Sequence, residues 1–306
     1  MDNVIVVVGP TASGKTKVSV ELAQLINGEI ISADSMQIYK YMDIGTAKPS
    51  MKERKGIKHF LIDEVYPNED FSVVKFQELA LKYIEQIICR GKVPIIAGGT
   101  GLYINSLIYN IKFSENETDW NLREELKKIA LEKGNEYLHS KLREIDPDSA
   151  DQIHVNNTKR IIRAIEVFKT TNKTITYHQR VSRLEASKYN YHLFGLSMER
   201  QLLYDRINKR IDCMVESGLV NEVKNLIALG YNEELAAMQG LGYKEIFWFL
   251  KGRVTFNEAI YLLKRDTRHY AKRQMTWFRK IKDVKWIDID ADINENKIIN
   301  EIINFI

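Results

Sequence analysis

Short apolar runs alternate with helix-like stretches over the first third of the chain. The runs at Val4–Val8, Glu29–Ala33 and Val93–Ala97 are brief, and the first consists wholly of β-branched residues. Such runs predict parallel strands that are covered on both faces. Between them, a helix is expected from Lys15 to about Ile26, and apolar residues recur at helical spacing over 76–88. Strand, helix and strand at these lengths predict a doubly wound α/β sheet.

Glycine use divides the chain. Nine glycines lie in residues 1–112, but only Gly134 lies between 113 and 187, where Glu, Lys, Leu and Ile dominate. We interpret 113–187 as a mostly helical insertion domain. Tyr191–Ser197 predicts a further strand, and helical patterning then continues to about Lys282. Residues 1–112 and 188–306 are therefore expected to form one core domain with C-terminal helices.

Composition narrows the class of protein only modestly. No apolar run approaches the ~20 residues that cross a bilayer, and the first strand leaves no room for a signal peptide. Cys89 and Cys213 lie far apart and form no CxxC pair, which argues against a disulfide framework or a structural zinc site. We expect a cytoplasmic, monomeric protein that is independent of membranes.

Positive charge is concentrated near the C-terminus. Between Lys264 and Lys285 there are nine Lys or Arg residues and two Asp residues, a local charge of +7 in a chain whose net charge is +4. The rest of the chain is therefore slightly acidic. This distribution favours a localised contact with a polyanion.

The turn after the first strand fits a P-loop. Gly9–Thr16 reads GPTASGKT, which matches G-x-x-x-x-G-K-[ST] between an apolar strand and a helix. In this pattern backbone N–H groups and the lysine contact phosphate oxygens, and the last hydroxyl can ligate Mg²⁺. We expect Mg²⁺ on Thr16 and a nucleotide or other diphosphate on Gly9, Pro10, Thr11, Ala12, Ser13, Gly14, Lys15 and Thr16.

Two further groups are predicted at the same edge of the sheet. The third strand ends at Gly98–Gly101, reading GGTG, with a hydroxyl on Thr100 but no carboxylate of the Walker-B kind. The second strand delivers Asp34 to the edge where ligands bind in such folds. From spacing alone, Asp34 could be a general base, a Mg²⁺ partner or a loop cap.

Several longer stretches resemble the tRNA isopentenyltransferase family, whose bacterial members are tRNA dimethylallyltransferases. They span nearly the whole chain in the family's order, and two of them are far more specific than the P-loop. The stretches are GPTASGKT (Gly9–Thr16), SADSMQIYKYMDIGTAKP (Ser32–Pro49), GGTGLYI (Gly98–Ile104), NTKRIIRAIEV (Asn157–Val167), GLGYKE (Gly240–Glu245) and TRHYAKRQMTWFR (Thr267–Arg279).

The resemblance implies an activity. Members transfer the dimethylallyl group of dimethylallyl diphosphate to N6 of adenine 37 in tRNA. By this resemblance Asp34 takes the proton from the amine, and Thr11 and Lys15 join it as catalytic residues. The donor diphosphate is then lined by Thr11, Lys15, Thr16 and Thr100, and the target nucleotide by Asp34, Ser35, Met36, Gln37 and Thr100.

This chemistry explains the missing Walker-B carboxylate, because no water has to be activated. Negative charge builds on the leaving diphosphate as the allylic C1–O bond breaks, and backbone N–H groups, Lys15 and Mg²⁺ would stabilise it. Water must also be kept away from the allylic cation, which implies a closed channel.

The basic helix near the C-terminus and the insertion are the candidate tRNA contacts. At 100° per residue, Arg265, Arg268, Lys272 and Arg279 share a narrow sector, opposite a set of apolar residues. With the family resemblance, we expect Arg268 and Lys272 to contact RNA phosphates.

Five further arginines are candidates, and four of them keep more than one interpretation. Arg206 and Arg210 could extend the basic surface or hold the diphosphate, the role taken for Arg210. In the insertion, Arg123 matches a family position for tRNA contact, and Arg160 and Arg163 could contact RNA or pair with Glu166.

Three other functions compete with this prediction. A P-loop small-molecule kinase would use ATP and not the prenyl donor. A relative that prenylates AMP would not need an extended basic face. A non-catalytic RNA-binding NTPase would keep all activity without the Asp34 carboxylate.

Overall fold

The computed structural model describes residues 1–112, 119–182, 187–290 and 295–305. They form two compact units: Met1–Ile104 together with Lys188–Ile306, and Asn105–Ser187. The first unit contains a parallel sheet, and the second is helical. We describe each unit by itself.

Within the described residues, the sheet of the first unit has six strands in the order β3–β2–β4–β1–β5–β6, and every neighbouring pair is parallel. The α/β fold and the four strands expected from the apolar runs are confirmed. The strands are β1 (Asn3–Val8), β2 (Gly28–Ser32), β3 (His59–Phe60), β4 (Val93–Gly98), β5 (Asn190–Met198) and β6 (Lys285–Ile289).

Strand β1 lies in the middle of the sheet, and its apolar run is fully buried. Side chains of successive strand residues point to opposite faces. Ile5 and Val7 pack in one core with helices α1 and α14, and helices α3 and α4 lie on the other face. The covering helices are α1 (Lys15–Leu25), α3 (Val73–Cys89), α4 (Gly101–Ile108) and α14 (Glu295–Ile303).

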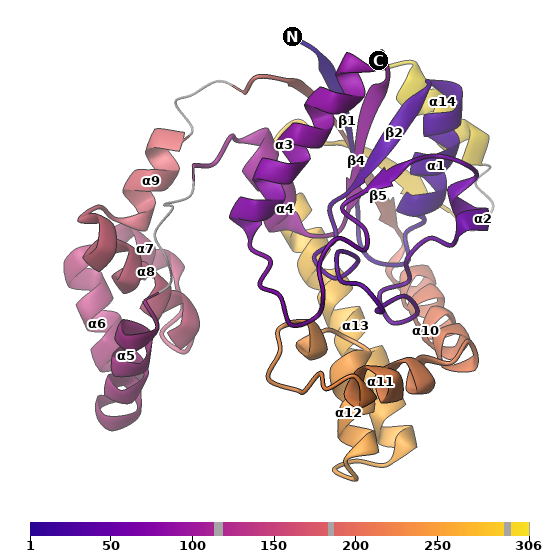
Figure 1. Cartoon of the computed structure of the whole chain (residues 1–306). Helices are drawn as coiled ribbons and strands as arrows, with labels where there is room; N and C mark the ends of the chain where they lie inside the picture. Colours follow the sequence, from indigo (N-terminus) through magenta and orange to yellow (C-terminus); the bar gives the residue numbers. More distant parts are fainter. Residues whose placement is uncertain (113–118, 183–186, 291–294, 306) are drawn as a thin grey trace. The chain divides into compact units, whose positions relative to one another are not determined.

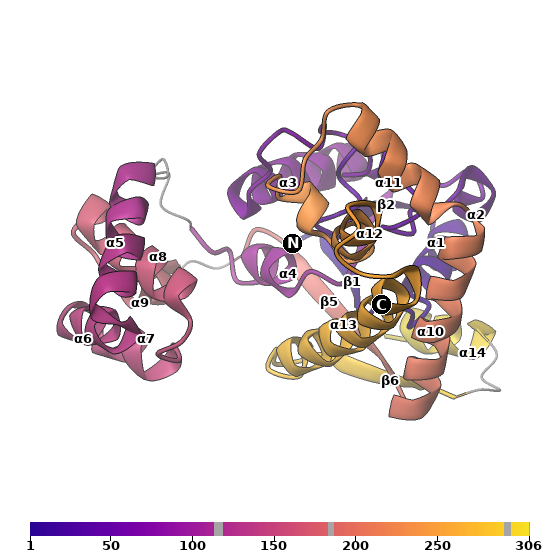
Figure 2. The ribbon, with the colours of Figure 1, turned by 90° about the horizontal axis from the view of Figure 1, so that it is seen from below.

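A second group of helices lies beyond the carboxyl ends of the strands (Figure 1), and Figure 2 looks onto this end. Its longest member, α13, begins with a capping box formed by Thr255 and Glu258 and buries Ala259, Leu263 and Phe278. The group comprises α10 (Arg200–Glu216), α11 (Leu219–Ala228), a 3₁₀ turn at Ala237–Gln239, α12 (Tyr243–Leu250) and α13 (Phe256–Phe278). A short helix, α2 (Met51–Arg54), lies in the loop before β3.

Residues 105–187 form a helical unit with its own apolar core. Ile161, Ile162 and Ile165 of α8 are buried together, as their helical spacing predicts. Leucines of α5 and α6 complete this core. The helices are α5 (Trp120–Lys133), α6 (Asn135–Ile145), α7 (Pro147–Gln152), α8 (Thr158–Thr171) and α9 (Ile175–Ser182).

The structure differs from the sequence-based prediction at two places. The boundary between the units falls between Ile104 and Asn105, inside α4, whereas glycine use suggested residue 113. A helix crosses this boundary, so no turn residue marks it. Strands β3 and β6 were not predicted, because β3 has two residues and β6 follows directly on the basic, helical stretch.

Among the described residues no helix is both long enough and apolar enough to cross a membrane.

A buried carboxylate organises the helical unit. Glu166 of α8 is 1% exposed and accepts hydrogen bonds at 2.9 Å from both Nε and Nη2 of Arg123. It also accepts from Arg163 at 2.7 Å and from the backbone N–H of Asp119 at 3.1 Å. Burial opposes ionisation of Glu166, but the two guanidinium groups outweigh it and lower its pKa.

Because the folded-state pKa of Glu166 is lowered, its contribution to stability is present above pH 4.5 and is lost as the pH falls further. At pH 7 we expect Glu166→Gln to lower the local opening free energy of α8 by about 2 kcal/mol, the scale of charged hydrogen bonds. Hydrogen exchange of the α8 amides measures this. The difference from wild type should shrink below pH 4.5.

The exposed Glu124, which pairs with Lys127, provides the matched control. Glu124→Gln should change exchange in α8 by much less, because exposed ion pairs contribute little. Equal effects of the two substitutions would contradict a special role for the buried carboxylate.

Candidate active site

The P-loop leaves β1 at Val8 and enters α1 at Lys15. Gly14 precedes the helix with φ +88°, a conformation that glycine adopts at little cost. In the first turn of α1, Lys15 Nζ donates to the carbonyl of Pro10 at 2.7 Å, and Thr16 is exposed. The loop therefore presents a lysine, a hydroxyl and the amino end of a helix at one place, an arrangement suited to a phosphate group.

The loop after β4 is joined to the one after β2. The backbone N–H of Ala33 donates to the Ala97 carbonyl at 2.8 Å, and that of Thr100 donates to the Ala33 carbonyl at 3.1 Å. A side chain on Gly98 would overlap the backbone of Ala33, so glycine is required at this crossing. Thr100 Oγ1 then accepts from the N–H of Ser35 at 3.0 Å. These bonds fix the backbone on both sides of Asp34.

Asp34 caps its own loop. Its Oδ1 accepts from the backbone N–H of Met36 at 2.8 Å and from that of Gln37 at 3.4 Å. This is the loop cap that spacing allowed, and it holds the carboxylate in one orientation. The side chain also lines the cavity described below, so capping and a chemical role are compatible.

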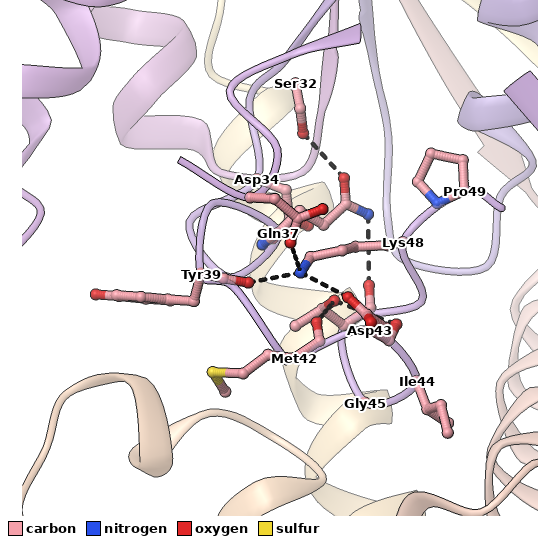
Figure 3. Close-up of polar contacts among 12 residues, drawn as sticks. Ser32, Asp34, Gln37, Tyr39, Met42, Asp43, Ile44, Gly45, Lys48 and Pro49 are labelled. Atoms are coloured by element: carbon pink, nitrogen blue, oxygen red, sulfur yellow. Dashed lines mark hydrogen bonds and ion pairs between the residues drawn. The ribbon is translucent and has the colours of Figure 1, made fainter. Parts of the chain in front are cut away.

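The segment that follows Asp34 is held from inside by Gln37 and Lys48 (Figure 3). The Gln37 amide accepts from Ser32 Oγ at 2.9 Å and donates to backbone carbonyls of the segment's far end. Lys48, whose side chain is 4% exposed, donates to the carbonyl of Tyr39 and to the carboxylates of Asp43 and Asp63. The amide of Gln37 is thus engaged within the loop.

Glu222 of α11 fixes the tip of the same segment from outside. Its carboxylate accepts from the backbone N–H groups of Asp43, Ile44 and Gly45 at 2.7–3.0 Å, and from the hydroxyl of the buried Tyr243 at 2.7 Å. The loop is consequently rigid although it has almost no regular secondary structure.

A cavity of about 380 Å³ lies between these loops and helices α10 and α13. The P-loop residue Thr11, the loop residues Asp34, Ser35 and Met36, and Arg210 of α10 all line it. One part of the wall is apolar and is formed by Ile207, Ile211, Met214, Leu241 and Leu263. Helix α13 adds Thr267, Tyr270 and Arg273, and the remaining lining residues are Gly45, Thr46, Gln239, Gly240, Gly242 and Lys244.

The polar end of the cavity has an excess of positive charge. Burial and the guanidinium of Arg210 lower the pKa of Lys15 to about 7, against the opposing effect of Asp34. Burial also lowers the pKa of Arg210, which Asp34 again opposes. Asp34 acts on both cations and Glu53 acts on Arg210 as well, yet burial and repulsion still lower the pKa of Lys15, and binding of an anionic ligand would offset this repulsion.

Tyr270 faces the same polar groups. Burial and the charge of Asp34 raise its pKa to about 12, while polar contacts with Thr100 and Gln274 act in the opposite direction. Its hydroxyl therefore stays protonated at neutral pH and can serve as a hydrogen-bond donor.

The candidates for the basic helix lie in different environments. Arg268 is half-buried, donates to Asn208 Oδ1 at 2.7 Å and lies over the ring of Tyr204, so it ties α13 to α10. Lys272 is exposed. Arg273, which the helix projection did not select, reaches the cavity. Of Arg206 and Arg210, the second is the one that lines the cavity.

Of the three candidate arginines in the insertion, two pair with a buried carboxylate and one is exposed. Arg123 and Arg163 are bound to Glu166, the pairing that was one of the two interpretations open for Arg163. Arg160 is exposed near the start of α8. These residues belong to the helical unit, which we describe separately from the cavity.

Sequence reasoning missed several residues of the site. Gln274 accepts from the N–H of Thr11 at 2.8 Å and donates to the carbonyl of Gly99 at 2.9 Å. Glu222 and Tyr243 were missed as well. Gln274 follows Tyr270 at i, i+4 spacing within the specific stretch Thr267–Arg279, and this spacing could have indicated that Gln274 faces the site. Nothing near Glu222 in the sequence indicates the loop that it holds.

The fold and the site define a P-loop α/β protein whose phosphate-binding loop opens onto a partly apolar cavity with a carboxylate at its edge. A family model described as IPP transferase matches residues 37–281. The chain belongs to this family.

Relatives and solved structures agree with that assignment. The tRNA dimethylallyltransferase of Acetivibrio thermocellus is 62% identical over 302 residues, which cover 99% of this chain and 96% of that protein. The full-length tRNA isopentenylpyrophosphate transferase of Bacillus halodurans is 46% identical, with a TM-score of 0.75 and coverage of 100% of this chain and 95% of that one. A eukaryotic dimethylallyltransferase acting on tRNA is 29% identical, with a TM-score of 0.80 and coverage of 94% and 74%.

The lowered pKa of Lys15 predicts unusual reactivity. In brief acetylation with acetic anhydride over a pH series, labelling of Lys15 should have its midpoint near pH 7, because the amine reacts only when unprotonated. Inorganic pyrophosphate should move this midpoint to higher pH, because negative charge favours the protonated form. Peptide mapping by mass spectrometry measures both effects.

Exposed Lys52 serves as the internal control in the same samples. Its labelling curve should not respond to pyrophosphate. If the labelling curves of Lys15 and Lys52 coincide, with or without pyrophosphate, the positive charges of Lys15 and Arg210 do not oppose each other in the site.

Proposed function

We propose that the protein transfers the dimethylallyl group of dimethylallyl diphosphate to N6 of adenine 37 in tRNA. The observation that carries the proposal is the composition of one cavity: Thr11 of the P-loop, Asp34 and an apolar wall are all parts of its lining. A phosphate cradle next to apolar side chains suits a short prenyl diphosphate. Membership of the family supports the same activity.

The donor would bind with its two ends in different surroundings. The P-loop, Lys15 and Arg210 would hold the diphosphate, since Arg210 lies close enough to Lys15 to lower its pKa. The branched five-carbon chain would contact Ile207, Ile211 and their apolar neighbours. Burial of this chain contributes free energy of roughly 25 cal/mol per Å², and the diphosphate supplies the electrostatic part.

Thr16 would take part in binding Mg²⁺. Thr16 is an exposed residue in the first turn of α1, and the described residues contain no group of three His, Cys, Asp or Glu side chains that could hold a metal. An ion held by one hydroxyl and by diphosphate oxygens suits Mg²⁺, which keeps several waters and favours phosphate ligands. The bound ion would neutralise part of the charge on the leaving group.

Transfer requires a new C–N bond and the loss of one proton. The adenine N6 attacks C1 of the donor as the C1–O bond breaks, and diphosphate leaves with the bonding electrons. The amine nitrogen becomes cationic, and the carboxylate of Asp34 takes one of its protons. Backbone N–H groups and Lys15 stabilise the charge that develops on the diphosphate. The orientation of Asp34 is already fixed by the N–H of Met36.

The apolar wall and the end of β4 favour this reaction over phosphoryl transfer. A kinase of this fold would orient Mg²⁺ and its nucleophile with a carboxylate at a strand end, whereas β4 leads into Gly98–Gly101 without one. A prenyltransferase that acts on free AMP would not need the exposed Lys272 or the cavity residue Arg273. We therefore favour an RNA acceptor, whose base must leave its stack to reach Asp34.

Asp34→Asn tests the assignment of the base. The amide keeps an oxygen that can accept from Met36, so the loop should persist, but it cannot take the proton. We expect turnover to fall by about 10²–10⁴-fold, the usual contribution of a general base, while binding of tRNA and donor is retained. Nucleoside mass spectrometry of the reacted tRNA measures turnover.

The exposed Asp205 of α10 gives a matched control, because Asp205→Asn makes the same chemical change outside the cavity. Its turnover should equal that of wild type. Wild-type turnover in Asp34→Asn would eliminate Asp34 as the base and favour a non-catalytic role.

Arg273 is the cation of α13 that we expect to meet the acceptor, because it lines the cavity yet is exposed. Arg273→Gln should weaken tRNA binding and lower the slope of log K against log salt by about one, as for the loss of one phosphate contact. Binding titrations at several salt concentrations give the slope. Lys82→Gln, on the exposed side of α3, should leave it unchanged.

An unchanged slope for Arg273→Gln would remove this residue from the RNA contact surface.

A further inference from the structure

The side chain of Gln274 joins the two phosphate-side loops. It projects from α13, is 6% exposed, and uses both ends of its amide: Oε1 accepts from the N–H of Thr11 at 2.8 Å, and Nε2 donates to the carbonyl of Gly99 at 2.9 Å. A reversed amide would set two donors against each other at Thr11 and two acceptors at Gly99. The two loops therefore determine its orientation.

The Gln274 amide links the two loops where the hydrogen-bonded pairing of β1 and β4 ends. Strands β1 and β4 are paired in parallel register as far as Val8 and Gly98. Beyond that pair the strand pairing ends, and Gln274 bonds to Thr11 after β1 and to Gly99 after β4. A side chain on Gly99 would overlap the amide nitrogen of Gln274, so the loop approaches as closely as a backbone without Cβ allows.

The same helix face reaches the acceptor side of the cavity. Tyr270 and Thr267 lie one and two turns before Gln274 and line the cavity, and Trp277 packs against Gly101 in the turn that follows. Polar contacts of Tyr270 with Thr100 and Gln274 both affect its pKa. One rigid helix therefore contacts the P-loop, the Gly98–Gly101 loop and the cavity together.

We propose that Gln274 is a positioning residue that fixes the spacing between the P-loop and the Thr100–Ser35–Asp34 branch of the site. The inference rests on the proposed function, in which the P-loop carries the donor diphosphate and the Thr100–Ser35–Asp34 branch faces the acceptor amine. Gln274 touches neither reacting group. It acts by keeping C1 of the donor aligned with the amine and not with water.

Hydrolysis of the donor is the reaction that competes with transfer, and it gives a specific readout. If the amine is misaligned, the C1–O bond still breaks, water attacks C1, and the products are dimethylallyl alcohol, diphosphate and a proton. Transfer and hydrolysis consume the same donor, so their ratio reports alignment at the reacting carbon. This ratio does not depend on the fraction of enzyme that is correctly folded.

Gln274→Met tests the proposal, because methionine has a similar length and volume but neither hydrogen bond. We expect transfer to fall by about 10²-fold in kcat, the effect of a misplacement of about 1 Å. The KM for tRNA should stay within about threefold of wild type, since the acceptor contacts remain. The alcohol-to-transfer ratio should rise at least tenfold, measured by chromatography of products from labelled dimethylallyl diphosphate.

Two further variants complete the experiment. Gln201→Met makes the same substitution on the exposed face of α10 and should keep the wild-type ratio. Gln274→Glu keeps an acceptor for the N–H of Thr11 but has no donor for Gly99, so it should also raise the ratio. It provides the answer if Gln274→Met does not accumulate as folded protein.

The proposal is overturned if Gln274→Met and Gln274→Glu lose activity while the product ratio stays at the wild-type value, because loss of folded enzyme alone gives that pattern. Wild-type kcat in both variants overturns it as well. Failure of the wild-type enzyme to prenylate tRNA is a different result, and would reject the proposed function itself.

Discussion

Everything in the site depends on how the backbone is held where parallel strands end. The strands of a parallel sheet deliver their loops to one edge, but the ladder of hydrogen bonds stops there. In this protein hydrogen bonds beyond the strand ends hold the loops together. The N–H of Thr100 donates to the Ala33 carbonyl, and Thr100 Oγ1 accepts from the N–H of Ser35. The Gln274 amide bonds to both Thr11 and Gly99. These bonds fix the P-loop and Asp34 relative to each other without a bound ligand.

The second constraint is electrostatic. Lys15 and Arg210 lie close together beside Asp34, and burial makes their positive charges costly. The positive charges of this site oppose each other although its backbone is well bonded. A diphosphate would supply the missing negative charge, and its departure from C1 during the reaction would increase that charge where the cations already lie. Binding and catalysis then use the same groups.

Much of the fold followed from sequence alone because its signals are local. The β-branched run Val4–Val8, the P-loop and the helical periodicity of α8 depend only on neighbouring residues. Asp34 and Arg210 were found through resemblance and strand-end position. What sequence could not give were contacts across long separations: Gln274 lies 263 residues from Thr11, and Glu222 lies 179 from Asp43. The contacts of Arg268 with Asn208 and Tyr204 were missed as well, because the projection of one helix ignores its neighbour α10.

The most direct test of the central claim is mass spectrometry of nucleosides from tRNA incubated with the purified protein and Mg²⁺, with either dimethylallyl diphosphate or ATP as the second substrate. We expect that only the prenyl donor adds mass, equal to one dimethylallyl group, to the adenosine that follows the anticodon. A phosphorylated product formed from ATP, with no prenylated adenosine from the other reaction, would contradict it.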